Sequence, residues 1–222
     1  AQTRAKDVRA VYDEMTSASG VPEQTGAPLR EGFGASWLEE TGVEEQVVAA
    51  KACRADLVIL PRPTREYETS ALMTLNAALM QSGRPVVAAP PLKGGAPSTG
   101  PFKRIALFWN GSTEATRAVA AAQPFFAGAE SVTILRVEEE EWFAPTEDLE
   151  AYLARHGVAT VVSKILPRAG RTGAALLAGT GEVGADLMVM GAYTRSKLRQ
   201  LILGSVTGHV MREAKLPVLM CH

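Results

Sequence analysis

The sequence has few of the residues that several classes of functional site require. Its 222 residues include two cysteines and three histidines. Cys53 and Cys221 are too few for a disulfide framework, and because each lies in or beside an apolar run, we interpret both as buried small side chains. The histidines have no cysteine or carboxylate partners at ligand spacing, so we predict no metal site. Only 6% of the residues are aromatic, which favours packing over a base-stacking surface.

An excess of one charge is also missing. There are 23 basic and 24 acidic residues, so the chain lacks the basic excess that gives non-specific affinity for nucleic-acid phosphates. No apolar run approaches the roughly 18 residues of a membrane span. Residues 1–7 lack the apolar segment of a secretory signal. We therefore expect a cytoplasmic protein with neither a nucleic-acid nor a membrane partner.

The sequence does contain an internal repeat. The segment Ala55-Asp56-Leu57-Val58-Ile59-Leu60 resembles residues 185–190, in which Asp186 stands 130 positions after Asp56. A second match follows in the same order, because residues 84–88 resemble residues 216–220. Two matches at nearly the same offset indicate two copies of one unit.

The residues between the copies predict where the two units divide. Residues 93–101 are rich in glycine, proline and small polar residues, as is typical of a linker. We therefore predict a first domain at residues 1–92, a linker at 93–101 and a second domain at 102–222.

The second copy alternates short apolar runs with helical patterns. We expect strands at 104–109, 131–137, 158–166, 185–190 and 217–221, and helices at 113–126, 146–156, 172–184 and 205–214. This alternation predicts right-handed crossovers and a parallel sheet covered on both faces. We expect Ser112 or Thr113 to cap the helix at 113–126, and Thr146 to cap the helix at 146–156.

The first copy is shorter. We expect helices at 1–18 and 43–53, strands at 56–60 and 85–89, and a short strand at 36–39. Counterparts of the first strand, first helix and second strand are missing, although the first strand is central in a doubly wound sheet. We therefore predict that the natural sequence continues upstream with a strand and an Asp-Gly-Ser-like turn.

The most informative stretch for function is residues 190–207. An apolar strand ends at Gly191, a polar loop follows, and Gly204-Ser205 opens a helix. A glycine at a strand end lets a ligand approach the backbone, and a helix N-terminus with a hydroxyl at Ser205 favours an anion. Because the dipole contributes only about 0.3–1 kcal/mol, useful affinity needs a pocket for the rest of the ligand. The pattern therefore favours a nucleotide over free phosphate.

This stretch resembles the universal stress proteins, in the form with two such domains in one chain. ATP-binding members of that family carry Gly-x2-Gly-x9-Gly-[Ser/Thr] after the fourth strand. Gly191, Gly204 and Ser205 match this motif, whereas Thr194 stands at the second glycine. Residues 110–112, Asn-Gly-Ser, are similar to the family's Asp-Gly-Ser after the first strand.

The resemblance implies two α/β domains of the adenine-nucleotide-alpha-hydrolase-like (Rossmann-like) type, the first incomplete. Each would have a parallel five-stranded sheet in the order 3-2-1-4-5. It implies ATP as the ligand, with or without Mg²⁺, with Asn110 and the backbone of Val137 near the adenosine. The residues implied at the site are Asn110, Gly111, Ser112, Val137, Met190, Gly191, Thr194, Gly204, Ser205, Val206 and Thr207.

The two departures from the family pattern affect this site. If position 194 needs a positive φ, Thr194 costs about 1–2 kcal/mol relative to glycine. Asn110 removes a potential metal ligand together with a charge that would repel phosphate. Arg195, Lys197 and Arg199 fit either phosphate binding or a solvated loop.

The matching loop of the first copy predicts no second nucleotide site. Residues 61–68 contain no glycine, and their prolines supply no N–H for phosphate. The resemblance implies instead that Pro85–Ala89 pairs with Pro217–Cys221 within one chain, which would cover both strand edges. It also allows a homodimer.

Three functions remain open. The leading hypothesis is a stress-response sensor or regulator that binds an adenine nucleotide in its second domain. The alternatives are a nucleotide-free interaction or scaffold protein and a slow ATP hydrolase. We assign no catalytic residue, because the sequence offers no evident acid–base pair.

Overall fold

The computed structural model describes residues 2–24, 33–62, 68–91, 101–137, 145–158, 161–166, 172–193 and 205–222. The chain divides into two compact units, Ala1–Gly42 and Val43–His222. Residues 93–100 of the expected linker lie outside the described residues, so the domain boundaries stay a prediction. Among the helices that are described, none is long and apolar enough to cross a membrane.

The first unit contains helix α1, Gln2–Ser19. The ring of Tyr12 on this helix lies 5.4 Å from the ring of Trp37, and the Arg9 guanidinium lies over both rings. The strand expected at 36–39 is not present, since the described residues of this segment form only a single bridge between Glu23 and Ala35. Trp37 therefore contributes to packing in this unit without a strand ladder.

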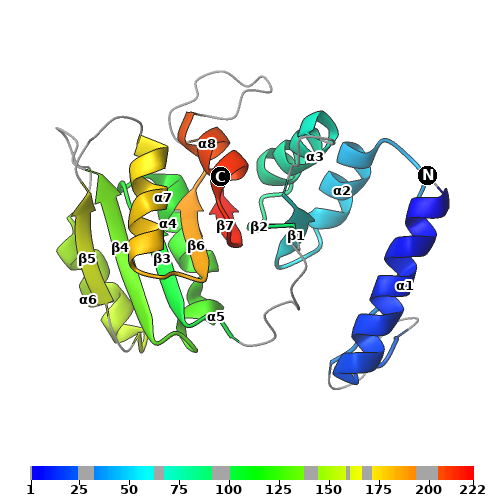
Figure 1. The fold of residues 1–222 in the computed structure, drawn as a ribbon, viewed down its shortest axis with the longest axis horizontal. Coiled ribbons are helices and arrows are strands. Elements are labelled where there is room, and N and C mark those ends of the chain that lie inside the picture. Colours follow the sequence, from blue (N-terminus) through cyan, green and yellow to red (C-terminus); the bar gives the residue numbers. More distant parts are fainter. Residues whose placement is uncertain are drawn as a thin grey trace. The chain divides into compact units, whose positions relative to one another are not determined.

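The second unit is built on one seven-stranded sheet in the order β1-β2-β7-β6-β3-β4-β5 (Figure 1). The strands are β1 Val58–Pro61, β2 Val86–Ala89, β3 Arg104–Phe108, β4 Ser131–Val137, β5 Val161–Leu166, β6 Leu187–Gly191 and β7 Val218–Cys221. Strands β3 to β7 are mutually parallel and lie in the order β5-β4-β3-β6-β7. The strands of the second copy therefore lie in the expected order 3-2-1-4-5, but the expectation of a purely parallel sheet of five strands is wrong, because the sheet has seven strands and continues from β7 into the antiparallel β2 and then β1.

The junction between β2 and β7 is antiparallel and symmetric. Val87 lies opposite Leu219, flanked by the pairs Val86–Met220 and Ala88–Val218. The offset of 132 that aligns Pro85 with Pro217 makes Val87 and Leu219 counterparts in the repeat. Two copies of the same strand edge therefore pair around a local two-fold axis, and each edge satisfies the hydrogen bonds of the other.

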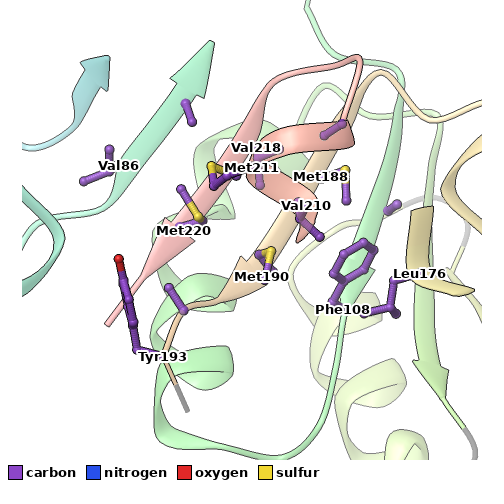
Figure 2. Close-up of a cluster of buried hydrophobic side chains, with 14 of the residues drawn as sticks. Val86, Phe108, Leu176, Met188, Met190, Tyr193, Val210, Met211, Val218 and Met220 are labelled. Atoms are coloured by element: carbon purple, nitrogen blue, oxygen red, sulfur yellow. The ribbon is translucent and has the colours of Figure 1, made fainter. Parts of the chain in front are cut away.

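Seven helices are described in this unit, and two hydrophobic clusters accompany them. Alternation along β3 places Ile105 and Leu107 in one cluster, and Ala106 and Phe108 in the other. Figure 2 shows Phe108 within the second of these clusters. The strand is apolar on both sides because both faces of the sheet are covered. The helices are α2 Glu44–Ala52, α3 Glu68–Gln81, α4 Thr113–Ala121, α5 Gln123–Phe126, α6 Thr146–Arg155, α7 Thr172–Glu182 and α8 Ser205–Glu213.

Helix α3 was not predicted from the sequence. Leu75, Ala78 and Leu79 on this helix are buried in the same cluster as Val210 and Met211 of α8. Because Thr74 and Ala77 are buried as well, the segment presents no simple polar stripe, and the helical period is hard to detect. The helix depends on tertiary packing that a local pattern does not show.

Helix α4 is shorter than expected. The single helix predicted at 113–126 is divided into α4 and α5, with Pro124 in the first turn of α5. Proline has no N–H to bond to the carbonyl of Ala120, four residues earlier, and its ring would clash with that carbonyl in a continuous helix. The chain therefore starts a new turn at Gln123.

Of the two helix caps that were predicted, the one at Ser112 is confirmed and the one at Thr146 is wrong. Ser112 caps α4, its side chain accepting a hydrogen bond from the Ala115 N–H. The prediction for Thr146 is wrong, because Pro145 occupies the cap position of α6 without a side-chain bond and Thr146 is buried within the first turn. A residue one position inside the helix cannot bond back to these N–H groups as a cap does.

The two cysteines also differ. Cys221 is buried at the end of β7, and burial raises the pKa of its thiol to about 11. Cys53 follows α2 and is exposed. The interpretation of Cys53 as a buried residue is therefore wrong, because position 53 lies past the end of the helix where the chain turns toward β1.

Candidate functional site

Strands β3 and β6 form the point of the sheet at which the chain changes direction. They are parallel neighbours, with Ile105 opposite Leu187 and Leu107 opposite Val189. From β3 the chain passes through α4 to β4 on one side, and from β6 through α8 to β7 on the other. Open α/β sheets bind ligands at the carboxyl ends of strands at such a switch point. The residues that follow β3 and β6 are therefore the candidate site.

The turn after β3 is held by its own side chains. The Oδ1 atom of Asn110 accepts a hydrogen bond from the Ser112 N–H at 3.2 Å, and Ser112 Oγ accepts one from the Ala115 N–H at 3.1 Å. Gly111 between them has a φ of +69°, a conformation that favours glycine. Asparagine supplies the same acceptor as aspartate in this kind of turn. The change from the family's aspartate to Asn110 therefore preserves the turn.

A close backbone contact requires a glycine at position 191. A Cβ atom at this position would lie 2.6 Å from the backbone N of Ala115 and 2.8 Å from the backbone C of Glu114. The backbone that approaches Gly191 is thus the first turn of α4, so packing against this helix by itself requires a glycine here. That a ligand also approaches Gly191 stays a prediction. The contact joins the turn after β3 to the end of β6.

The remaining site residues are placed in different environments. Val137 at the end of β4 and Met190 in β6 are 2% and 3% exposed, and both side chains belong to a core cluster. Only their backbone can therefore face a ligand. Helix α8 begins at Ser205, as expected, with Val206 partly buried and Thr207 buried. Thr194, Gly204, Arg195, Lys197 and Arg199 lie outside the described residues.

Tyr193 was not predicted as a residue of the site from the sequence. Its φ is +65°, which is uncommon for a residue other than glycine. Its side chain is 8% exposed, and its hydroxyl donates a hydrogen bond to Asn76 Oδ1 on α3. Figure 2 shows Tyr193 just past the end of β6. Nothing local in the sequence marks this residue, because its partner lies 117 positions away.

Burial raises the pKa of Tyr193 to about 12, from an ordinary value of 10.0. The folded protein therefore holds this proton at a pH at which the unfolded chain releases it. We expect the free energy of unfolding to fall as the pH rises from about 10 toward 12. Urea unfolding across this range checks the expectation. The control is Tyr193→Phe, whose stability should fall less over the same interval; equal pH slopes for the two proteins would contradict it.

The described residues contain no group of three or more His, Cys, Asp or Glu side chains that could hold a metal ion. The turn after β3, the backbone at the end of β6 and the start of α8 instead offer hydroxyl groups and backbone N–H groups. Such groups suit an anionic or polar organic ligand.

Comparison of the whole chain with solved structures shows the fold. A universal stress protein from Archaeoglobus fulgidus matches with a TM-score of 0.69 and 21% identity, over 99% of this chain and 76% of that one. A functionally unknown protein from Pseudomonas aeruginosa matches with a TM-score of 0.55 and 15% identity, over 97% of this chain and 76% of that one. At these identities the matches concern the fold alone.

A further match covers about half of the chain. A universal stress protein solved in complex with cAMP matches with a TM-score of 0.43 and 22% identity, over 55% of this chain and 99% of that one. No curated protein matches the sequence significantly.

The comparison with family models concerns the part of the chain that contains the candidate site. The model of the universal stress protein family matches residues 101–222. This region includes β3 to β7 and every residue of the predicted nucleotide site. Since the match extends over more than half of the sequence, the chain belongs to the universal stress protein family.

Proposed function

We propose that this protein is a stress-response sensor or regulator that binds an adenine nucleotide at the switch point of its sheet. The observation that carries the proposal is the contact between Gly191 and the backbone of Glu114 and Ala115. This contact brings together the two segments, after β3 and after β6, that carry the family's nucleotide motifs. A ligand bound there would touch both.

The proposed ligand is ATP, with or without Mg²⁺. Asn110 and the backbone of Val137 would contact the adenosine. The phosphates would bind the start of α8, where the helix N-terminus favours an anion. The residues proposed around ribose and phosphates are Met190, Gly191, Thr194, Gly204, Ser205, Val206 and Thr207. Gly111 and Ser112 would shape the turn below them.

We also propose a tandem organisation, with domains at 1–92 and 102–222 joined by a linker at 93–101. The symmetric pairing of β2 with β7 supports it, because counterparts in the repeat meet at the centre of the junction. On this proposal the paired edges are internal to one chain. A homodimer would use another surface. The proposal includes a cytoplasmic location.

Calorimetry with Mg-ATP on the full chain tests the proposed ligand. We expect saturable binding below millimolar nucleotide. The informative variant is Thr194→Gly, which should bind about tenfold more tightly if Thr194 lines the phosphate path and bound phosphate requires a positive φ there, because glycine adopts that conformation without the cost of about 1–2 kcal/mol. The first turn of α4 offers a control in Thr113→Ala, an exposed position outside the proposed site.

The two negative outcomes have different meanings. Absence of binding at millimolar Mg-ATP would contradict the proposed function. Unchanged affinity of Thr194→Gly, with a binding wild type, would remove Thr194 from the site. Slow release of ADP that a Gly204 substitution abolishes would identify the protein as an ATP hydrolase.

The alternative is a nucleotide-free interaction or scaffold protein. The contact between Gly191 and α4 is compatible with this alternative too, because packing against α4 requires a glycine at position 191 even without a ligand. Asn110 and Thr194 both depart from the motif of the ATP-binding members. The calorimetry above separates the two functions.

A further inference from the structure

The end of β6 is tied to the first half of the chain through Tyr193. The tyrosine hydroxyl donates a hydrogen bond to Asn76 Oδ1, and Asn76 belongs to α3, which lies before β2 in the sequence. The Tyr193 ring also makes an edge-to-face contact with the His222 ring, with a distance of 5.9 Å between the ring centroids and an interplanar angle of 86°. Tyr193 is therefore held from two directions.

The last residues of the chain, Cys221 and His222, also contact the end of β6 and helix α4. The Nδ1 atom of His222 lies 3.3 Å from the carbonyl oxygen of Ala192, within hydrogen-bond distance, and Ala192 N–H donates to the Cys221 carbonyl at 2.8 Å. The main-chain oxygen of His222 accepts a hydrogen bond from Arg117 Nη1 on α4 at 2.9 Å. One contact network thus connects α3, the end of β6, the end of β7 and α4.

The sequence provides no counterpart of the Tyr193–Asn76 side-chain bond on the other side of the local two-fold axis. The repeat offsets of 130 and 132 make Pro63 the counterpart of Tyr193 and Gly208 the counterpart of Asn76. Neither proline nor glycine has a side chain that can donate or accept a hydrogen bond. Asn76 in the first half of the chain therefore holds Tyr193 in the second half, and the repeat offers no pair of side chains for the reverse contact.

The hydrogen bond from Tyr193 to Asn76 helps to stabilise an unfavourable backbone conformation, because Tyr193 has a φ of +65°. A left-handed conformation costs a residue other than glycine about 1 kcal/mol or more, so it persists only where the surroundings hold it. Burial of the ring and the hydrogen bond to Asn76 supply that restraint. Without the bond, the positive φ next to Ala192 has less to stabilise it.

We propose that Asn76 is a positioning residue for the nucleotide site, acting through Tyr193. The inference rests on the proposed function, and it gives the first half of the chain, which lacks a glycine loop of its own, a part in the binding of nucleotide by the second half. Asn76 touches no ligand. It fixes the backbone at the end of β6, where Met190 and Gly191 would meet the nucleotide.

The test compares three variants of the full chain by calorimetry with Mg-ATP. Asn76→Leu keeps the approximate side-chain size but removes the acceptor, Tyr193→Phe removes the donor, and Asn76→Asp keeps an acceptor oxygen. We expect Asn76→Leu and Tyr193→Phe each to weaken binding by about three- to tenfold, the range of one hydrogen bond. Asn76→Asp should stay within about twofold of wild type. The double variant should bind no more weakly than either single variant, because both remove the same bond.

A second readout separates this inference from the proposed function. Amide hydrogen exchange of residues 191–193 in the ligand-free protein should be faster in Asn76→Leu and in Tyr193→Phe, and should return to the wild-type rate in Asn76→Asp. Unchanged exchange in both hydrogen-bond variants would overturn the positioning role. So would a wild type that binds Mg-ATP and variants that bind it equally well. A wild type that fails to bind, with exchange altered as expected, would contradict the proposed function alone.

Discussion

Gly191→Ala is expected to lower the free energy of unfolding by about 3 kcal/mol, which is at the upper end of the usual cost of overpacking. The new Cβ would lie 2.6 Å from the backbone N of Ala115 and 2.8 Å from the backbone C of Glu114. A backbone cannot rotate away as a flexible side chain can, so β6 or the start of α4 must shift. Urea unfolding at constant pH measures the change.

Gly181→Ala is the matched control. Gly181 lies in α7, where a Cβ would meet nothing within 4 Å. Alanine is favoured over glycine inside a helix, so this variant should gain up to about 1 kcal/mol. Equal stability of Gly191→Ala and wild type would show that α4 can move away at little cost. The contact would then not fix the turn after β3 relative to the end of β6.

The same variant bears on function. Because the contact at Gly191 joins the two segments that carry the nucleotide motifs, a shift of α4 would displace the turn at 110–112 relative to the end of β6. Binding of Mg-ATP should therefore weaken together with stability, whereas Gly181→Ala should leave binding unchanged.

Asp186→Ala should lower the free energy of unfolding by about 2–3 kcal/mol. The Asp186 carboxylate accepts hydrogen bonds from two backbone N–H groups at the start of β3, that of Lys103 at 2.8 Å and that of Arg104 at 3.0 Å. Asp186 N–H also donates to the Arg104 carbonyl. Charge-assisted bonds of this kind contribute about 1.5–3 kcal/mol each, and partial exposure reduces their sum.

The repeat supplies a control for this prediction. Asp56 is the counterpart of Asp186 in the first copy, and it is exposed. Asp56→Ala should change stability by less than about 0.5 kcal/mol, as is usual for surface positions. Chemical denaturation of both variants checks the pair. A loss as large for Asp56→Ala as for Asp186→Ala would contradict the role assigned to the carboxylate of Asp186.

Local patterns in the sequence predicted most elements of the second copy. Short runs of apolar and β-branched residues marked β3, β4, β6 and β7, because strands covered on both faces contain few polar residues. Ser112 and Gly111 marked the turn that opens α4, since capping and a positive φ depend on neighbouring residues alone. The start of α8 at Ser205 was predicted for the same reason.

The predictions that failed required information from distant residues. A purely parallel sheet of five strands was expected, whereas the sheet has seven strands and β2 is antiparallel to β7. A short strand was expected at 36–39, whereas Trp37 packs on Tyr12. Cys53 was interpreted as buried, although the path of the chain after α2 exposes it.

The alternation of strands and helices, the repeat and the glycine and serine positions of the nucleotide motif are all visible in the sequence, because they depend on periodicity and on local backbone chemistry. Only the tertiary structure showed that α4 fills the space beside Gly191 and that Asn76 holds Tyr193 from 117 positions away. Both contacts join segments that are far apart in the chain and close in space. Their formation depends on strand order and register, which no local pattern contains.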